Sequence, residues 1–426
     1  MSATGEVSIA ARAPWLGDAD LQKLLAALSQ GGEEARVAGG AVRNALLGEP
    51  VADVDIATTN EPDATIARAR DAGFRTVPTG KEHGTITVIA GGRPLEVTTL
   101  RADVETFGRK ARVVFGRDWR ADAERRDFTI NALYARADGT VVDLVGGLAD
   151  LESRTLRFIG EPEARIREDF LRILRFFRFF AWYGSGRPDS EGLKACARLK
   201  DGLAQLSAER VWSELKKLLA APDPGRAILW MRTTGVLTQI LPETEKWGID
   251  AIPGLVAAGR DLGWQVDPLL RLVAMLPPDA MRLAAMAERL RFSKVETRRL
   301  DEWAKAPPPA PDTSALAFAK LLYRHGPEPL RDRLRLALAA ARSAAATDDK
   351  ALVAAGGYAR LLKQLEAWER PVFPLRGPDL EAAGFAPGKP LGEALRALEA
   401  EWVESGFSLD RDALAERAAK LRDAAD

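Results

Sequence analysis

Alternation of apolar and polar residues predicts a small mixed α/β fold in the first third of the chain. Asp20–Ser29 has the spacing of a short amphipathic helix, and Val51–Ile56 alternates apolar and acidic residues as a strand does. Thr85–Ala90 and Leu95–Leu100 are rich in β-branched residues and flank Gly91-Gly92, so we expect a hairpin. The pattern indicates one small sheet with helices on one side, not a repeated βαβ array.

The pattern changes near Glu161. Strand signals end there, and segments with helical spacing of Leu, Ala and Arg continue to the end of the chain. One continuous helix is predicted over Glu161–Tyr183 and another over Ala208–Leu219, and Ala306–Asp312 is the clearest Pro-rich break. The sequence therefore predicts an α/β head followed by an elongated all-helical remainder.

Composition restricts the chemistry. The 426 residues carry 61 basic and 61 acidic side chains, which excludes a uniformly basic nucleic-acid-binding surface but leaves room for a local basic track. Cys196 is the only cysteine and there are two histidines, so a Cys- or His-based metal cluster is not expected and carboxylates are the expected ligands. No apolar run approaches about 18 residues and Met1–Ala13 lacks a secretory signal, so we expect a cytoplasmic protein that does not enter membranes.

Two acidic residues lie two positions apart in the predicted strand Val51–Ile56. Because strand residues i and i+2 point to the same face, Asp53 and Asp55 are expected side by side. Adjacent carboxylates repel each other unless a cation lies between them, and oxygen ligands of this kind suit Mg²⁺. A surface strand with scattered acids is the alternative, and the D-x-D pattern alone favours that alternative.

Upstream residues strengthen the metal interpretation. Gly39-Gly40 precedes a predicted helix, and bare backbone N–H groups at a helix start favour a phosphate. Arg43 lies one turn further on and could bind the same phosphates. A phosphate site followed by two carboxylates predicts two-metal phosphoryl or nucleotidyl transfer.

Activation of an attacking hydroxyl usually needs a third carboxylate. Glu96, at the start of the second predicted hairpin strand, is the best candidate because one sheet could bring it beside Asp53 and Asp55. The alternative for Glu96 is an exposed acid on an edge strand. Glu82 and Asp143 are weaker candidates.

Five sequence motifs, in one order, resemble those of the class II tRNA nucleotidyltransferase and poly(A) polymerase family. They are VAGGAVRNALLG…DVDIATT (Val37–Thr59), ERRDFTINAL (Glu124–Leu133), DLVGGLADL (Asp143–Leu151), REDFLRILRFFRF (Arg167–Phe179) and AERVWSELKKLL (Ala208–Leu219). The family usually reads G-G-x-x-R-D, whereas Asn44 follows Arg43 here. Asparagine carries no charge but can still form local hydrogen bonds.

The resemblance implies roles for several residues. Asp169 and Arg172 would read the base edge of the incoming nucleotide, and Arg175 and Arg178 would lie near its phosphates or support the site. On one continuous helix, Asp169, Arg172 and Arg175 would share a stripe. The alternative is a basic helix whose arginines pair with local acids.

The same resemblance bears on the ribose and on the loop after the hairpin. It implies that Asp127 contacts ribose hydroxyls and Arg126 the nucleotide, whereas a salt bridge at a strand start is the alternative. Arg101–Arg117 lacks clear periodicity and predicts a mobile loop between strands. In the family such a loop helps to switch specificity from C to A, and its full length here favours complete CCA addition.

We therefore expect template-independent, Mg²⁺-dependent addition of C, C and A to the 3′ end of tRNA from CTP and ATP. Poly(A) polymerase and A-adding-only tRNA nucleotidyltransferase are the alternatives within the family. A non-catalytic RNA-binding relative is a third alternative, against which Asp53 and Asp55 argue. No obligatory protein partner is evident.

The resemblance also implies the fold class and the domains. We expect an α+β protein with a polymerase-β-like nucleotidyltransferase head over residues 1–157. A helical neck carrying the templating helix would span residues 158–222, a helical body 223–365, and a tRNA-binding helical tail 366–426.

Overall fold

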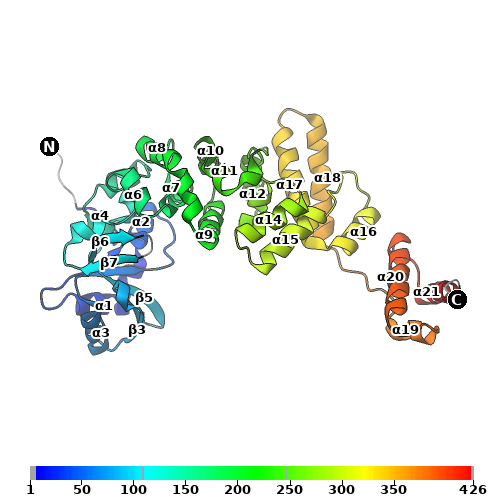
Figure 1. Cartoon of the computed structure of the whole chain (residues 1–426), viewed down its shortest axis with the longest axis horizontal. Helices are drawn as coiled ribbons and strands as arrows, with labels where there is room; N and C mark the ends of the chain where they lie inside the picture. The colour runs from blue at the N-terminus through cyan, green and yellow to red at the C-terminus, as the bar shows by residue number, and fades with distance from the viewer. Residues whose placement is uncertain (1–5, 108–109, 246, 424–426) are drawn as a thin grey trace. The chain divides into compact units, whose positions relative to one another are not determined.

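The computed structural model describes residues 6–107, 110–245 and 247–423 (Figure 1). Its contacts divide the chain into two compact units, Met1–Pro242 and Glu243–Asp426. The first unit holds a mixed sheet and helices, and the described part of the second is helical. The predicted α+β class, with a small sheet followed by a helical remainder, is confirmed.

The main sheet of the first unit has seven strands in the order β3-β4-β5-β2-β1-β8-β9. Its strands are β1 (Ala35–Ala38), β2 (Asp55–Thr58), β3 (Arg75–Gly80), β4 (Thr85–Ala90), β5 (Arg93–Thr99), β8 (Leu133–Ala135) and β9 (Val141–Asp143). The predicted hairpin is present as β4 and β5. Strand β2 runs parallel to β5, and in that register Asp55 pairs with Glu96. The topology thus brings together two acids that are far apart in sequence.

The predicted strand Val51–Ile56 is wrong at its start. Strand β2 begins at Asp55, and Asp53 lies in the irregular segment before it. The neighbouring strand β1 explains the difference, because its last pairing joins Ala38 to Asp55. After Ala38 the chain turns at Gly39 into helix α2 (Gly40–Leu47), so β1 offers no partner to residues before Asp55.

The segment predicted as a mobile loop forms a hairpin instead. Strands β6 (Arg101–Phe107) and β7 (Lys110–Phe115) pair antiparallel, and residues 108 and 109 lie outside the described residues. A backbone hydrogen bond of 2.9 Å from Gly116 N–H to the Leu100 carbonyl closes its base. The run Val113-Val114-Phe115 favours a strand, and this preference outweighs the mixed charge that suggested a loop.

Eleven α-helices are described in the first unit between Met1 and Pro242. They are α1 (Ala19–Leu28), α2, α3 (Pro62–Asp71), α4 (Trp119–Glu124), α5 (Gly147–Glu152), α6 (Pro162–Glu168), α7 (Leu171–Tyr183), α8 (Ser190–Arg198), α9 (Ala208–Leu219), α10 (Gly225–Thr233) and α11 (Val236–Ile240). Buried phenylalanines fix α7 to the sheet-bearing part, because Phe176 stacks on Phe158 with ring centroids 5.4 Å apart and Phe158 contacts Phe128 at 4.9 Å.

The single helix predicted over Glu161–Tyr183 is wrong. Helix α6 ends at Glu168, and Asp169 has an extended backbone (φ −155°, ψ 107°) before α7 begins at Leu171. The Asp169 carboxylate accepts the Leu171 N–H at 3.0 Å, as a capping residue does. Phe170 packs tightly on Gly202, where a β-carbon would come within 2.1 Å of its ring. Capping and packing therefore both place the break here.

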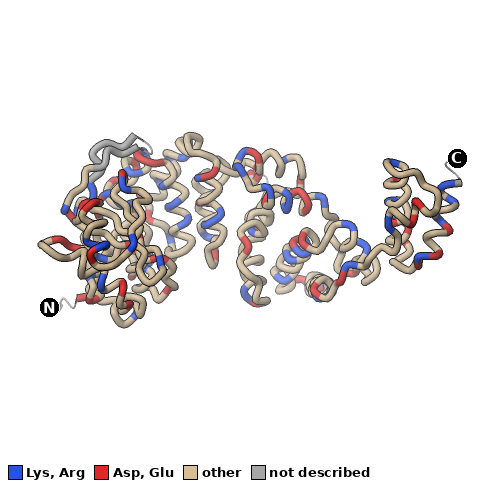
Figure 2. The backbone as a smooth tube through the Cα atoms, turned by 90° about the horizontal axis from the view of Figure 1, so that it is seen from below, with Lys and Arg blue, Asp and Glu red and all other residues tan. Residues whose placement is uncertain are grey.

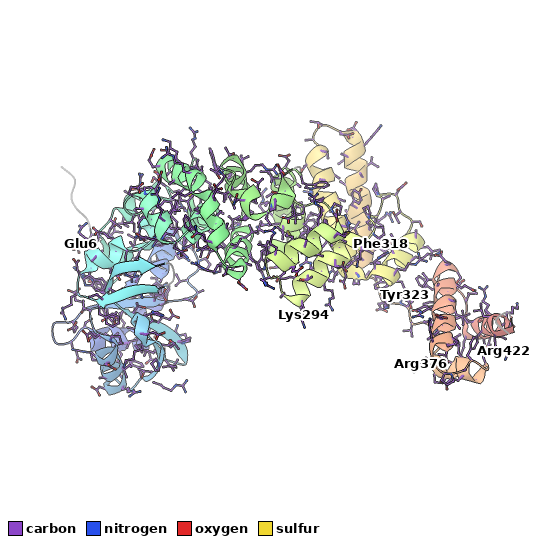
Figure 3. All side chains as sticks on the ribbon, viewed as in Figure 1. Glu6, Lys294, Phe318, Tyr323, Arg376 and Arg422 are labelled. Atoms are coloured by element: carbon purple, nitrogen blue, oxygen red, sulfur yellow. The ribbon has the colours of Figure 1, made fainter. Side chains whose placement is uncertain are left out.

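The second unit contains the helices α12 (Ala251–Asp261), α13 (Pro268–Val273), α14 (Ala280–Arg289), α15 (Lys294–Lys305), α16 (Ala315–His325), α17 (Pro327–Ala344), α18 (Asp349–Glu366), α19 (Gly377–Ala382), α20 (Lys389–Glu404) and α21 (Arg411–Asp423). Figure 3 labels Phe318 and Tyr323, both on α16. Phe318 belongs to a core with α17 and α18, whereas Tyr323 belongs to a core with Trp402 of α20. None of the described helices is long and apolar enough to cross a bilayer.

An ion-pair network ties three helices of the second unit together. Arg299 of α15 donates two hydrogen bonds of 2.9 Å to Asp332 of α17 and also binds Asp267, which caps α13. Asp332 is buried, and burial raises the pKa of its carboxyl despite the contacts with Arg299. Removing Arg299 would leave this carboxylate buried and unpaired.

Arg299→Ala is expected to lower the free energy of unfolding by about 3 kcal/mol at neutral pH, the low end for a broken buried pair because Arg299 is partly exposed. A carboxyl with a raised pKa costs stability as the pH rises through that pKa, so the deficit should shrink on acidification. Urea unfolding of the variant, with exposed Arg298→Ala on the same helix as control, measures both effects. Equal stability of the two variants would contradict the prediction.

Candidate active site

A cleft of about 600 Å³ lies within the first unit. Residues from β1, β2, β5, α2, α7, α9 and the segment after Trp119 line it. They are Ala38, Gly40, Arg43, Asp55, Ile56, Ala57, Glu96, Thr98, Asp122, Arg125, Arg126, Asp127, Asn131, Asp169, Leu171, Arg172, Arg175, Phe179 and Arg210. The cleft thus collects carboxylates and arginines from elements that are distant in sequence.

Asp55 and Glu96 lie side by side on the parallel strands β2 and β5, and both line the cleft. Partial desolvation raises the pKa of Asp55, and the charges of Glu96 and Asp53 raise it further. Asp53 is exposed and does not line the cleft, yet its charge acts on Asp55. A cation at this position would relieve the repulsion among the three carboxylates.

The described residues contain no cluster of three or more Asp, Glu, His or Cys side chains placed to hold a metal ion. The carboxylates alone are therefore not a preformed cage. They fit a cation that keeps waters and substrate phosphates as its remaining ligands, which is the common mode for Mg²⁺.

The weaker candidates for the third carboxylate have other positions. Asp143 accepts backbone N–H groups of residues 145 to 148 and so caps the start of α5. Glu82 is exposed beside His83 and does not line the cleft. Of the three acids considered, Glu96 is the one that the fold places next to Asp55.

Arg43 is 7% exposed and is held by neutral acceptors. It donates to Asn44 Oδ1 at 3.0 and 3.1 Å, to the Tyr183 hydroxyl at 2.8 Å, and to Asn131 Oδ1. Burial lowers its pKa, although an arginine remains charged. A buried guanidinium that donates to neutral acceptors retains its full positive charge for an anionic ligand in the cleft.

Two residues near Arg43, Asn44 and Gly39, have contacts and backbone angles that suit their residue types. Asn44 forms local hydrogen bonds, as expected: it accepts from Arg43 and donates to the Pro50 carbonyl at 2.8 Å. Gly39 has a positive φ of 66°, and a β-carbon there would lie 3.1 Å from Arg126 Nη1. Glycine is therefore required at the start of α2.

Asp127 and Arg126 line the cleft and are also ion-paired. Asp127 is buried and accepts from Arg175 Nε at 2.7 Å and from Asn131 Nδ2 at 3.0 Å. Burial opposes ionisation of Asp127, but the Arg175 charge and the hydrogen bonds outweigh it and lower the pKa. Arg126 pairs with Asp122 at 3.1 Å. Arg126 and Asp127 thus form salt bridges, as the alternative to nucleotide binding predicted, and both residues also line the cleft.

The expected helical stripe of Asp169, Arg172 and Arg175 is not observed. Asp169 precedes α7, and its carboxylate pairs with Arg210 of α9 at 2.6 Å. Arg172 pairs with Glu168 and donates to the Arg165 carbonyl at 2.6 Å. Both side chains nevertheless line the cleft.

Arg178 does not line the cleft. It pairs with buried Glu214 of α9 and lies over the Phe179 ring at 4.2 Å, so it fastens α7 to α9. Four further residues line the cleft that the sequence did not predict: Asp122, Arg125, Asn131 and Arg210. Three of them lie within two of the recognised motifs and Asp122 lies two residues before one of these motifs, so this position is the one sequence signal that could have found them.

Comparisons with known proteins show the family of the chain. Residues 35–157 match the family model of the poly(A) polymerase head domain, and residues 187–247 match the model described as the probable RNA and SrmB-binding site of polymerase A. Mouse mitochondrial CCA tRNA nucleotidyltransferase 1 is 35% identical over 92% of this chain and 88% of its own. The chain belongs to the class II tRNA nucleotidyltransferase and poly(A) polymerase family. Membership makes it a nucleotidyltransferase and indicates dependence on a divalent cation.

Other members of the family are similar over nearly the whole chain. The CCA-adding enzyme of Limosilactobacillus fermentum is 32% identical over 93% of this chain and 96% of its own. The crystal structure of the Bacillus stearothermophilus CCA-adding enzyme in complex with CTP has a TM-score of 0.70 at 25% identity, covering 95% of this chain and 97% of that one. The Thermotoga maritima CCA-adding enzyme complexed with tRNA shares the fold, with a TM-score of 0.62 at 20% identity over 97% of this chain and 98% of that one.

Proposed function

We propose that this protein adds C, C and A in turn to the 3′ end of tRNA, using CTP and ATP and no nucleic-acid template. The observation that carries the proposal is the pairing of Asp55 with Glu96 in a cleft that is also lined by arginines. Family membership and the names of the similar proteins support the reaction and its substrates.

Different residues of the chain carry out different parts of the proposed reaction. Glu96 accepts the proton of the terminal 3′-hydroxyl, whose oxygen bonds to the α-phosphorus while the bond to the bridging oxygen breaks and pyrophosphate leaves. Arg43 and the backbone at Gly39 and Gly40 bind the triphosphate. Asp53 and Asp55 would hold Mg²⁺ in a two-metal site, and the bound ions would neutralise phosphate charge and orient the reacting groups.

Selection of the nucleotide falls to the other lining residues. Asp169 offers an acceptor for the exocyclic amino group that cytosine and adenine share, and Arg172 offers donors for the ring acceptors of both bases. Asp127 and Arg126 bind the ribose side of the nucleotide. Arg175 orients Asp127 through its ion pair, and Arg178 supports α7 through Glu214.

The helical remainder would hold the rest of the tRNA. Figure 2 shows basic and acidic residues interspersed along the chain, in keeping with its zero net charge. Contacts are therefore expected from local basic side chains of the proposed body (223–365) and tail (366–426) to phosphates. A cytoplasmic location is part of the proposal, although some similar proteins are named mitochondrial.

The purified protein is expected to extend a tRNA ending at the discriminator base by three nucleotides and then stop. The test incubates tRNAs lacking CCA, lacking CA or lacking A with CTP, ATP or both, and reads product length on a sequencing gel. Generic RNA of similar length is the control and should not be extended. Long A tails on that RNA would favour a poly(A) polymerase, and extension only of tRNA lacking A would favour an A-adding enzyme.

A further inference from the structure

Asn44 supplies two of the hydrogen bonds that hold the buried Arg43 guanidinium. Arg43 Nε and Nη2 donate to Asn44 Oδ1 at 3.1 and 3.0 Å. Nη2 also donates to the Tyr183 hydroxyl at 2.8 Å, and Nη1 donates to Asn131 Oδ1. These four hydrogen bonds use four of the five N–H groups of a guanidinium. One N–H group therefore remains for a ligand.

The other end of the Asn44 side chain fixes the direction of its amide. Asn44 Nδ2 donates to the Pro50 carbonyl at 2.8 Å, in the chain segment that leads to Asp53. Turning the amide over would set its NH2 group against the Arg43 guanidinium, donor against donor. An amide therefore suits this position, because it donates to Pro50 and accepts from Arg43, whereas a carboxylate can only accept.

The surroundings of Arg43 leave its positive charge uncompensated. Burial lowers the pKa of Arg43, and two more distant charges act on that pKa in opposite directions, since Asp127 raises it and Arg178 lowers it. Both of these residues have ion-pair partners of their own, Arg175 for Asp127 and Glu214 for Arg178. The groups that bind Arg43 directly therefore place no negative charge beside it.

Arg43 lies at the end of the cleft where we place the triphosphate. Both Arg43 and Gly40, the first residue of α2, line the cleft, and a β-carbon on Gly40 would lie 3.6 Å from Arg43 Nη2. The guanidinium and the N–H groups at the start of α2 can therefore bind one anion together. Because a triphosphate carries several negative charges, its affinity depends on the net charge at this end of the cleft.

We propose that Asn44 is a positioning residue that fixes Arg43 for the triphosphate of the incoming nucleotide without neutralising it. This inference rests on the proposed function, because it assumes that Arg43 binds the triphosphate. It also gives a consequence to the departure from the G-G-x-x-R-D pattern, since an amide stands here where that pattern has a carboxylate. Asn44 acts through Arg43 and need not contact the nucleotide.

The test compares Asn44→Asp and Asn44→Ala with the native protein. Asn44→Asp keeps the shape of the side chain but adds a negative charge beside Arg43, and it should raise KM for CTP and ATP by about 10-fold at low salt, the effect of one partly screened charge. The value of kcat should change less, because the triphosphate is bound both before and during the chemical step. High salt should reduce the loss, because it screens the added charge.

Asn44→Ala keeps the positive charge but removes the acceptor that orients Arg43. It should raise KM less than Asn44→Asp does, and salt should change its difference from the native protein less. The matched control is Gln30→Glu, which adds the same charge on an exposed residue outside the cleft and should keep the native KM. Thermal unfolding checks each fold. If Asn44→Asp does not fold, Asn44→Ala carries the test, and a native KM in that variant would overturn the positioning role.

Equilibrium binding of CTP without tRNA separates this inference from the proposed function. Failure of the native protein to complete CCA would contradict the proposed function, while CTP binding by the two Asn44 variants would still test Asn44. Arg43→Ala should bind CTP more weakly than either variant, and unchanged binding would contradict the assignment of the triphosphate to Arg43 and this inference with it. A native KM in Asn44→Asp, or a loss no larger than that of Asn44→Ala, would overturn the role of the uncharged amide.

Discussion

Asp55→Asn is expected to reduce nucleotide incorporation by about 10³-fold or more. The substitution keeps the shape of the side chain but removes the charge of a proposed metal ligand, and charge stabilisation worth several kcal/mol corresponds to a factor of this size. Asp53→Asn should also lose activity, because the charge of the Asp53 carboxylate acts on Asp55 and would attract the same cation. Primer extension over a range of Mg²⁺ concentrations measures both variants.

The same substitution should leave the fold as stable or more stable at pH 7. The pKa of Asp55 is raised in the folded protein, so this carboxyl favours folding below its unfolded pKa and costs stability as the pH rises through the folded pKa. Asparagine removes that cost. Asp71→Asn, an exposed acid on α3, is the control and should retain activity. Near-native incorporation by Asp55→Asn would contradict the assignment of the metal site.

Asp169→Ala is expected to lower discrimination between nucleotides by roughly 10- to 100-fold. Each hydrogen bond to a charged group contributes about 1.5–3 kcal/mol, and this variant removes the acceptor for the amino group of cytosine and adenine. Incorporation of UTP and GTP should rise relative to CTP and ATP in single-nucleotide assays on tRNA lacking CCA. Metal dependence should not change, because Asp55 lies on the separate strand β2 and Asp53 lies just before that strand. If all four triphosphates lose activity equally, Asp169 supports the site without reading the base.

Local patterns predicted one hairpin of the sheet and two of the acids that line the cleft. The hairpin of β4 and β5 followed from β-branched runs around two glycines, and Asn44 behaves as its amide chemistry implied. Glu96 was predicted next to Asp53 and Asp55 because one sheet could bring them together, and the parallel register of β2 and β5 places it opposite Asp55, whereas Asp53 lies before the strand.

The errors have a common cause, which is tertiary context. Strand β2 starts at Asp55 because β1 turns away at Gly39, and this is invisible in the alternation of residues 51–56. The break at Asp169 depends on packing of Phe170 against Gly202 as well as on capping. Periodicity suggested a continuous helix since apolar spacing is similar on both sides of the break. Arg210 was missed because its partner, Asp169, lies on another element.

The parallel ladder between β2 and β5 makes the Asp55–Glu96 pair tolerant of some changes to the chain and intolerant of others. Backbone pairing, not a side-chain contact, sets Asp55 opposite Glu96. New termini opened at the exposed Gly92 turn would leave this pairing intact. One residue inserted between Leu95 and Glu96 would instead place these two side chains on the same face of the sheet, so that either Glu96 turns away from Asp55 or Leu95 leaves the core. We therefore expect that this enzyme tolerates circular permutation at the turn between β4 and β5. A single-residue insertion within β5 should abolish its activity.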